Sequence, residues 1–504
     1  MRRAKYIVTA VIVCLVWVVV TGCANTAGSK TNGQDVKIQW KDRGLERLVR
    51  EYLNKPSGTI YSSELSGIKS LRIAGSDIQH PEEKDEAFAK RIETKAEKGQ
   101  QPGDNMERKI YYLDDFLYFP DLEQLAIKEG MLEGEISVVS NMTNLKVLEL
   151  ENCHIADISP LASLVNLNRL NLRGNKALSD LKPLAALQNL QELDLSACGD
   201  GKTSLDLTPV ASLSGLKKLN LESILTDDLR PLARLTDLEE LKVATGSLKP
   251  LAGLTNLTSL TVSSQQGELS DLSPLVNMKK MKALSLGPSG VSDLRSLSEL
   301  RELEYLDLRV NKISDLKPLA DLKNLNYIYL AEPQVRDLSP LAGLEKLSRL
   351  TVNCNQVSDL TPLTGLNKLA FLTIVSGKKI TNPAPLTKLS QLSGLEITGS
   401  NLADISFLTG LPQLQHLDLS RNRISDLSPL AGLTKLTELT LANNGITDLA
   451  PLAKLKSLTA LRIENNRVQD LSPLAGLANL ASLSLDGNSV SDLSPIKHVQ
   501  NVDR

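Results

Sequence analysis

Residues 436–455 read LTELTLANNGITDLAPLAKL, and versions of this stretch recur along most of the chain. Leu439 and Leu441 alternate with polar or small residues, which predicts a short strand that buries its leucines on one side. The pattern LxxLxL, with isoleucine, valine or methionine in place of some leucines, occurs eighteen times, from Leu71 to Leu485, mostly at a spacing of 22 residues. A repeat of that length indicates one strand and one return segment in each unit.

The segment after each strand predicts how the unit closes. A small polar residue stands three positions past the second strand leucine, where it can satisfy the buried backbone groups of a turn. The following IxDLSPL contains a proline, which excludes a long helix and favours 3₁₀ turns. We therefore expect flat coils with a concave parallel sheet and a convex side of 3₁₀ turns and loops. The small polar residue is asparagine at Asn175, Asn311, Asn355, Asn422, Asn444, Asn466 and Asn488.

One such coil cannot fold by itself. Burying about seven leucine or isoleucine side chains stabilises a coil by roughly 2 kcal/mol each, whereas ordering its backbone costs roughly 1 to 2 kcal/mol per residue. Neighbouring coils must supply the difference, as in a solenoid. Strands at about 4.8 Å per step would span roughly 80 Å of arc over eighteen coils, a length that suits a macromolecular partner.

Composition narrows the class of partner. Aromatic residues make up only 3 % of the chain, so leucine must supply most of the packing. The formal net charge is −2 at pH 7, and no basic stripe follows the predicted strands. Because nucleic-acid binding depends on positive surface, we expect no nucleic-acid partner.

The first residues predict a location. Three basic residues among the first five precede an apolar run over residues 6–20, which leads to VTGC at residues 20–23. This segment resembles a lipoprotein signal, which implies a signal peptide over residues 1–22 and lipidation of Cys23. An uncleaved signal anchor is the alternative, although the apolar run is short for a spanning helix.

The residues after the signal fit a tether. Residues 23–35 begin with the predicted lipidated Cys23 and continue with small and polar side chains. Several acyl chains on Cys23 would form a stable membrane anchor. Ala24, rather than aspartate, follows the cysteine, so nothing resembles an inner-membrane retention signal. We expect a lipid-anchored protein on the extracytoplasmic face of a bacterial cell membrane.

Residues 36–70 predict an N-terminal cap. Leu45, Leu48, Val49 and Leu53 have helical spacing. A helix at this place would shield the open edge of the sheet from other chains.

This segment and the repeats resemble a known family. Residues 36–53, VKIQWKDRGLERLVREYL, look like the helical cap of many secreted bacterial leucine-rich repeat proteins, and residues 417–430, LDLSRNRISDLSPL, resemble the internalin type. The resemblance covers roughly residues 36–496 and implies a leucine-rich repeat horseshoe, an α/β repeat solenoid, over residues 71–496. Such proteins act mainly as surface binders through their concave face. The chain lacks an LPxTG sorting signal, and residues 497–504 read as a tail.

A charged insertion at residues 79–111 interrupts the repeat near its start. Ala87, Phe88, Ile92 and Ala96 could form the apolar edge of a short helix. One interpretation is a solvated excursion, and the other is a lid or specificity loop over the first coils. The four histidines are scattered and no catalytic motif appears, so we expect no enzyme activity; a site built on the insertion is the weakest alternative.

Three cysteines fall within the predicted repeats. Cys153 and Cys198 occupy the asparagine position two coils apart, about 10 Å, which is too far for a disulfide. We interpret both as buried substitutes for asparagine. Neither these two nor Cys354 forms a metal-binding motif, so we expect no metal and no cofactor.

Aromatic and basic residues cluster on the predicted concave face. In consecutive coils the position before the first strand leucine reads Tyr, Tyr, Arg, Phe, Gly and His. Tyrosine and arginine are enriched at binding hot spots, and aromatic rings could also stack on a sugar. The alternative is cross-strand packing that only stiffens the sheet. The candidate ligand-binding residues are Tyr305, Tyr327, Tyr329, Arg349, Phe371, His416 and Arg309.

An aspartate recurs in the return segment of most coils. A row of carboxylates could bind Ca²⁺, but one carboxylate per coil is too few for a site. We expect each aspartate to cap the amides of the following turn. The positions are Asp157, Asp180, Asp228, Asp271, Asp293, Asp315, Asp337, Asp359, Asp404, Asp426, Asp448, Asp470 and Asp492.

Together these features predict a cell-surface lipoprotein that binds a protein or a glycan through the concave face of a rigid solenoid. The main alternative is a structural component of the cell envelope without a specific ligand.

Overall fold

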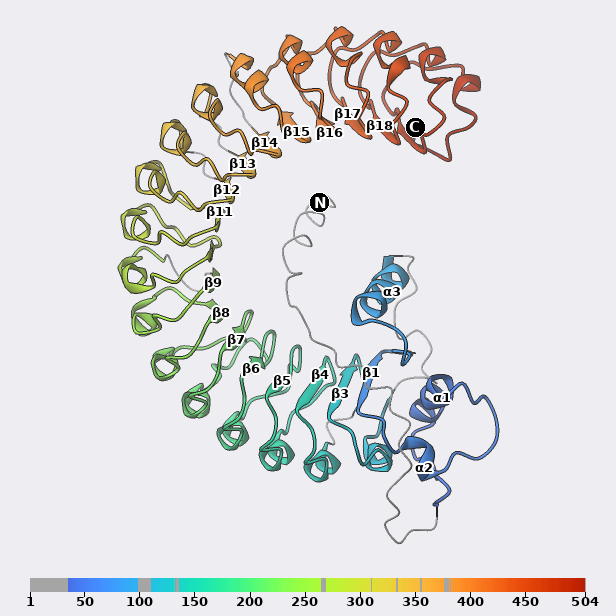
Figure 1. Ribbon diagram of the computed structural model, residues 1–504, viewed down its shortest axis with the longest axis vertical. Helices are drawn as coiled ribbons and strands as arrows, with labels where there is room; N and C mark the ends of the chain where they lie inside the picture. Colours follow the sequence, from blue (N-terminus) through green and yellow to red (C-terminus); the bar gives the residue numbers. More distant parts are fainter. Residues whose placement is uncertain are drawn as a thin grey trace.

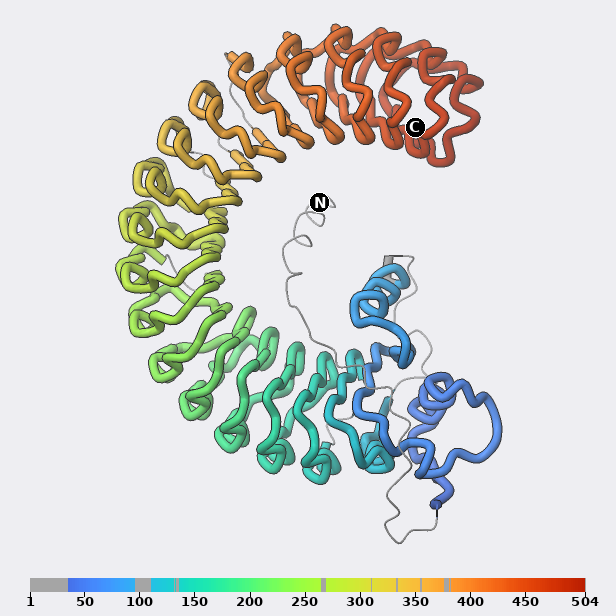
Figure 2. The backbone as a smooth tube through the Cα atoms, viewed as in Figure 1, coloured from blue at the N-terminus to red at the C-terminus, as the bar shows by residue number. Residues whose placement is uncertain are grey.

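The computed structural model describes residues 35–97, 110–130, 132, 136–263, 269–309, 311–331, 334–353, 356–375, 380 and 382–503. The coils stack into an open horseshoe with strands along the inner rim and short helical turns along the outer rim (Figure 1). The backbone tube shows the same coil repeated around the horseshoe after the N-terminal helices (Figure 2). This architecture confirms the α/β repeat solenoid predicted from the sequence.

One sheet lines the concave side. Its strands are β1 (Ser70–Ala74), β2 (Asp77–Ile78), β3 (Gln124–Lys128), β4 (Val147–Glu151), β5 (Arg169–Asn171), β6 (Glu192–Asp194), β7 (Lys218–Leu221), β8 (Glu240–Ala244), β9 (Ser259–Ser263), β10 (Ala283–Leu286), β11 (Tyr305–Arg309), β12 (Tyr327–Ala331), β13 (Arg349–Asn353), β14 (Phe371–Val375), β15 (Gly394–Thr398), β16 (His416–Asp418), β17 (Glu438–Thr440), β18 (Ala460–Arg462), β19 (Ser482–Ser484) and β20 (Asn501–Asp503). Neighbouring coils pair in parallel, and among these described strands the short β2 alone pairs antiparallel, with β1.

The strands β2 and β20 are additions to the eighteen predicted from LxxLxL. β20 lies within residues 497–504, for which the sequence predicts only a tail. Val502 of β20 is in register with Leu483 of β19, so it continues a column of strand leucines. The repeat pattern does not reveal β20 because valine stands at the first two leucine positions of LxxLxL, Val499 and Val502, and arginine stands at the third.

The return segments form 3₁₀ helices, as the proline in IxDLSPL predicts. Each begins one residue after a buried or half-buried apolar residue, and most carry proline at their first or second position. The 3₁₀ helices are η2 (Asp114–Tyr118), η3 (Ser137–Asn141), η4 (Ser159–Ser163), η5 (Lys182–Ala186), η6 (Thr208–Ser212), η7 (Arg230–Arg234), η8 (Lys249–Leu251), η9 (Ser273–Asn277), η10 (Arg295–Leu297), η11 (Lys317–Leu319), η12 (Ser339–Leu341), η13 (Thr361–Leu363), η14 (Ala384–Lys388), η15 (Ser406–Gly410), η16 (Ser428–Leu430), η17 (Ala450–Lys454), η18 (Ser472–Leu474) and η19 (Ser494–Ile496).

The buried asparagines satisfy the backbone of the turn after each strand, as predicted. The Asn175 Oδ1 accepts the N–H groups of Cys153 at 3.1 Å and Ile155 at 3.0 Å, and its Nδ2 donates to the carbonyls of Leu150 and Leu172. Each side chain therefore joins its own coil to the preceding one. The same pattern is present at Asn311, Asn422, Asn444, Asn466 and Asn488, whereas Asn355 lies outside the described residues.

Cys153 and Cys198 are buried free thiols at the asparagine position. The Cys198 Sγ donates to the Leu172 carbonyl at 3.0 Å, as the amide of an asparagine would. Burial raises the pKa of both thiols to about 12. The interpretation as asparagine substitutes is confirmed for these two, and Cys354 lies outside the described residues.

We expect iodoacetamide to leave Cys153 and Cys198 unmodified in the folded protein at pH 8, because burial removes both access and the reactive thiolate. Peptide mass spectrometry after timed labelling measures this directly. In 6 M guanidinium chloride both thiols should react within minutes. Rapid labelling without denaturant would contradict the buried positions.

The return-segment aspartates cap the turns, as predicted. The Asp426 Oδ1 accepts the Ser428 N–H at 2.8 Å, and its Oδ2 accepts the Ser428 hydroxyl group at 2.9 Å. The backbone hydrogen bond lowers the pKa of Asp426 below its ordinary value of 3.8. All thirteen predicted positions accept an N–H group two residues ahead, and Asp206, which the sequence analysis omitted, does the same.

These caps predict acid sensitivity. Asp404, Asp426 and Asp470 have a lower pKa in the folded state, so their contribution is complete above the unfolded pKa near 4 and is lost as the pH falls through the folded pKa. We expect the urea midpoint, followed by circular dichroism, to fall between pH 6 and pH 3. Asparagine accepts the same N–H without titrating. The triple variant with asparagine at these positions should therefore lose less stability; an equal loss would contradict the assignment.

An N-terminal helical region covers the end of the sheet at β1, and it contains α1 (Arg43–Tyr52) and α2 (Ser62–Leu65). In α1, Leu45, Leu48 and Val49 are fully buried, as their spacing predicts. The helix packs beside β2, which itself pairs with the outer edge of β1. Among the helices of the described residues, none has the length and hydropathy to cross a membrane.

Two buried aspartates attach this region to the first coils. The Asp42 carboxylate accepts the Leu45 N–H at the start of α1 and the N–H groups of Tyr111 and Tyr112, where the insertion ends. Asp115 accepts the Asp42 N–H at 2.7 Å. Burial is the main cause that raises the pKa of Asp115, although these hydrogen bonds oppose it. The cap and the coil after the insertion are therefore joined through one polar cluster.

Candidate binding surface

Six of the seven predicted ligand-binding residues lie on the concave face of four neighbouring strands, β11 to β14. The parallel register places Tyr305, Tyr327, Arg349 and Phe371 in one row. Tyr329 lies two residues along β12, in the adjacent row on the same face. We call Tyr305, Tyr327, Tyr329, Arg349, Phe371 and the neighbouring Arg309 the aromatic patch.

The side chains of the aromatic patch pack against one another across the strands. The rings of Tyr305 and Tyr327 stack with centroids 4.7 Å apart and planes inclined by 10°. The Arg349 guanidinium lies 4.4 Å from the centre of the Phe371 ring. The patch is thus preformed, and it stays accessible, because Phe371 is 37 % exposed and the tyrosines are half-buried.

A buried carboxylate lies beneath the patch. Asp307 is only 1 % exposed, and its Oδ2 lies 2.7 Å from the Arg309 Nη2. The Arg309 guanidinium also lies 5.4 Å from the centre of the Tyr329 ring, so Asp307 fixes its position. Burial raises the pKa of Asp307, and Arg309 opposes that rise. Sequence reasoning missed Asp307, although its place between the two leucines of LDLR marks it as concave.

Gly394 on β15 leaves room for the ring of Phe371. A methyl group at Gly394 would lie only 2.5 Å from the Phe371 Cδ1, so any larger residue would displace the ring. His416 follows on β16, two strands from Phe371, and its Nδ1 lies 3.5 Å from the Glu438 carboxylate. The structure therefore places His416 in the predicted row but pairs it with Glu438 rather than with the patch.

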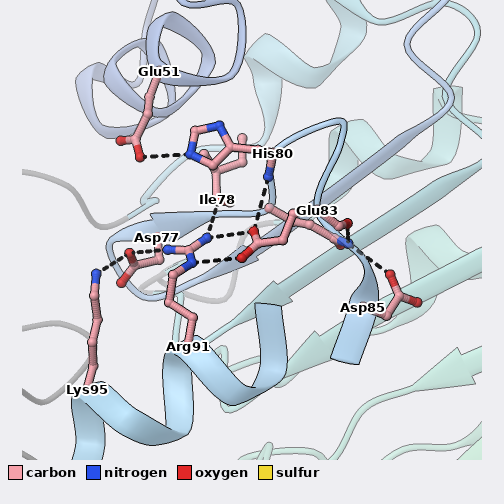
Figure 3. Close-up of polar contacts among 9 residues, drawn as sticks. Glu51, Asp77, Ile78, His80, Glu83, Asp85, Arg91 and Lys95 are labelled. Atoms are coloured by element: carbon pink, nitrogen blue, oxygen red, sulfur yellow. Dashed lines mark hydrogen bonds and ion pairs between the residues drawn. The ribbon is translucent and has the colours of Figure 1, made fainter. Parts of the chain in front are cut away.

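The insertion forms an anchored helix, α3 (Asp85–Glu97), on the inner side of the horseshoe at its β1 end (Figure 1). The Arg91 guanidinium binds the Glu83 carboxylate with two hydrogen bonds, of 2.9 and 2.8 Å, and the Asp77 carboxylate of β2 at 2.9 Å (Figure 3). Lys95 also binds the Asp77 carboxylate, at 2.5 Å. The predicted helix is confirmed, and of its predicted apolar edge Phe88 is buried and Ile92 is half-buried, whereas Ala87 is exposed.

Further contacts tie the insertion to its surroundings. The His80 Nε2 lies 3.5 Å from the Glu51 carboxylate of α1 (Figure 3), and the Asp85 carboxylate lies 3.4 Å from Arg72 of β1. Residues 98–109 of the insertion lie outside the described residues. The insertion is thus held by the first coil and the cap, and a lid function for it stays a prediction.

We also considered the described residues as sites for a metal ion or a small ligand. In the described ranges, no three His, Cys, Asp or Glu side chains come together as a potential metal site. Hollows of about 440 and 310 Å³ are lined by other residues than those of the aromatic patch. An extended surface, rather than an enclosed cavity, is what the patch offers to a ligand.

Comparison with known families supports the repeat assignment. The family model of leucine-rich repeats in two copies matches residues 143–186, 301–343, 390–432, 412–454, 434–476 and 456–498. The fold is a leucine-rich repeat solenoid. No curated protein sequence matches the chain significantly.

Several solved leucine-rich repeat structures are similar to this chain at low identity. An internalin, inlF, from Listeria monocytogenes is 25 % identical, with 88 % of this chain and 94 % of that chain covered and a TM-score of 0.35. The TLR13–ssRNA13 complex is 18 % identical over 77 % and 62 % of the chains, with a TM-score of 0.54. The receptor kinase ectodomain GASSHO1/SCHENGEN3 from Arabidopsis thaliana, in complex with CASPARIAN STRIP INTEGRITY FACTOR 2, is 21 % identical over 78 % and 54 %, with a TM-score of 0.50.

Proposed function

We propose that this protein is a bacterial cell-surface lipoprotein that binds a macromolecular partner through the aromatic patch. The observation that carries the proposal is the patch itself. Aromatic residues make up only 3 % of the chain, yet four of them gather with two arginines on adjoining concave strands. Residues of these types dominate binding hot spots, and a preformed surface loses little entropy on binding.

The fold alone does not select the class of ligand. Solenoids of this fold are known in complex with ligands as different as CASPARIAN STRIP INTEGRITY FACTOR 2 and ssRNA13. The net charge of −2 argues against a nucleic acid here, which leaves a protein or a glycan.

The location rests on the sequence around Cys23. We propose that signal residues 1–22 are removed, that Cys23 is lipidated and that the small, polar residues 24–35 tether the solenoid to the extracytoplasmic face of the membrane. Replacing Cys23 by alanine should move the protein from the membrane fraction to the soluble fraction. Unchanged membrane association would count against lipidation.

A pull-down from envelope and extracellular fractions tests the binding function. The bait is the full chain, purified in detergent, beside the Tyr327→Ser/Phe371→Ser double variant. A partner retained by the parent and lost by the variant supports binding at the patch. If neither bait retains a protein or a glycan, the alternative of a structural envelope component gains support, since stacked rings also stiffen a sheet.

A further inference from the structure

Each ring of the aromatic patch already has at least one face in contact with a neighbour, which reduces the area that a sugar could stack on. Tyr305 and Tyr327 cover each other, and Arg309 covers one face of Tyr329. Phe371 lies between the Arg349 guanidinium and the backbone of Gly394. A pyranose ring binds an aromatic residue by lying flat on its face, whereas apolar side chains of proteins also pack against ring edges. The patch therefore favours a protein over a glycan.

An acidic surface continues the concave face beyond the patch. The strands β15, β16 and β17 carry the carboxylates of Glu396, Asp418 and Glu438 and contain no lysine or arginine. We call these three residues the acidic strip. Glu396 and Asp418 are register partners on adjacent strands, so their side chains project side by side. Burial, and secondly the charge of Asp418, raises the pKa of Glu396.

The hydrogen bonds of the acidic strip involve neutral groups. Glu396 accepts the Thr373 hydroxyl group at 3.4 Å, and Asp418 accepts the Ser420 N–H at 2.8 Å. Glu438 lies 3.5 Å from His416. These contacts orient the carboxylates. Glu396 and Asp418 nevertheless remain two like charges on adjacent strands, and neither strand contains a lysine or an arginine.

The N-terminal half of the same sheet is arranged differently. The Arg169 guanidinium lies 3.1 Å from the Glu149 carboxylate on the neighbouring strand, and Lys218 lies 3.0 Å from Glu240. There the protein pairs its own charges across strands. The strands that carry Glu396 and Asp418 and the strands on either side of them, β14 to β17, contain no lysine or arginine, and Arg462 of β18 follows in the same row two strands from Asp418. Both carboxylates can therefore pair with a cation of a partner, and a half-buried carboxylate beside an apolar surface binds an incoming cation more strongly than an exposed one does.

The positive charges of the patch do not cancel the acidic strip. Arg309 is paired with the buried Asp307, and β11 is four strands away from β15. Arg349 lies over the ring of Phe371, two strands from Glu396. The concave face thus changes from aromatic to acidic between β14 and β15.

Resting on the proposed function, we infer that the partner is a protein whose contact segment presents an apolar or aromatic side chain beside lysine or arginine. The apolar side chain packs on the aromatic patch, and the cation pairs with Glu396 and Asp418. Adjacent strands are about 4.8 Å apart, so Tyr327 and Asp418, four strands from each other, lie roughly 19 Å apart along the sheet. An extended segment of about six residues or more spans that distance.

The test uses two defined probes on the full chain in detergent: a phage-displayed library of random 12-residue peptides and an array of glycans. We expect selection to enrich peptides with lysine or arginine near an aromatic or apolar residue. Synthetic copies should bind the Glu396→Gln/Asp418→Asn variant at least tenfold more weakly than the parent. Their affinity for the parent should also fall as NaCl rises from 50 to 500 mM, which tests the charge contribution without any substitution.

The outcomes separate this inference from the proposed function. Selected peptides without basic enrichment, or peptides that bind the charge-neutral variant and the parent equally, would overturn the inference. Glycan binding that is lost in the Tyr327→Ser/Phe371→Ser variant would also overturn it, yet would support the patch as a binding site. Ligands unaffected by that double variant would instead contradict the proposed function itself.

Discussion

The Tyr327→Ser/Phe371→Ser variant is expected to bind the partner on the order of 10² to 10³ times more weakly than the parent. Each hot-spot anchor contributes about 2 kcal/mol or more, and 1.4 kcal/mol corresponds to a factor of ten in affinity. Both side chains are accessible on the concave face, and both are held in place by neighbours, Tyr305 and Arg349. Titration calorimetry or surface plasmon resonance with the captured partner measures the loss.

Stability distinguishes binding from mere packing in this experiment. Loss of the tyrosine stack and of the Arg349 contact should cost only about 1 to 2 kcal/mol of unfolding free energy. Tyr112→Ser is the matched control, because Tyr112 is 42 % exposed and its ring centre lies 4.7 Å from the Lys41 Nζ, but Tyr112 comes directly after the insertion and does not belong to the aromatic patch. That control should retain binding. A double variant that binds normally but unfolds far more readily would favour cross-strand packing as the role of the patch.

A substitution outside the patch residues provides an independent check. Gly394→Ala introduces a methyl group where the Phe371 ring now lies, so the ring must move while its chemistry stays the same. Gly394 is in a regular strand, and alanine is compatible with that backbone. We therefore expect weaker binding with little change in the urea midpoint. Unchanged binding would show that the position of Phe371 is unimportant.

The repeat pattern determined most of the architecture in advance. The spacing of the strand leucines, the proline after most of the aspartates and the asparagine of many turns are local features that recur along the chain, so sequence alone predicted the sheet, the 3₁₀ turns and the caps. The N-terminal helix and α3 also followed from apolar spacing. β20 did not, since valine and arginine stand where LxxLxL has its two strand leucines.

The candidate site was only partly predictable. The register of the repeats correctly brought Tyr305, Tyr327, Arg349 and Phe371 into one row, because one residue per coil projects at each position. What the rings contact depends on rotamers and on cross-strand partners, which a single repeat does not encode. For the same reason the sequence did not reveal the buried Asp307 beneath Arg309, the pairing of His416 with Glu438, or the space that Gly394 provides.

The largest expected loss of stability comes from replacing one of the asparagines that bond to the backbone of the turn after a strand. In Asn175→Ala, two buried N–H groups and two buried carbonyls lose the side chain that joins two coils. Each unsatisfied group costs about 1 to 3 kcal/mol, so we expect the local unfolding free energy to fall by about 4 kcal/mol or more. Asn189→Ala is the matched control, because its exposed side chain makes one hydrogen bond, to the Val165 carbonyl. That variant should lose less than about 1 kcal/mol.

The buried thiols allow this loss to be measured in the coils concerned. Cys153 and Cys198 lie in the coils before and after Asn175, and they become reactive only when those coils open. A loss of 4 kcal/mol corresponds to roughly a 10³-fold faster iodoacetamide labelling when opening is reversible and fast. Asn189→Ala should label at nearly the parent rate. Because coils of a solenoid are stabilised by their neighbours, similar rates for the two variants would mean that adjacent coils replace the asparagine hydrogen bonds.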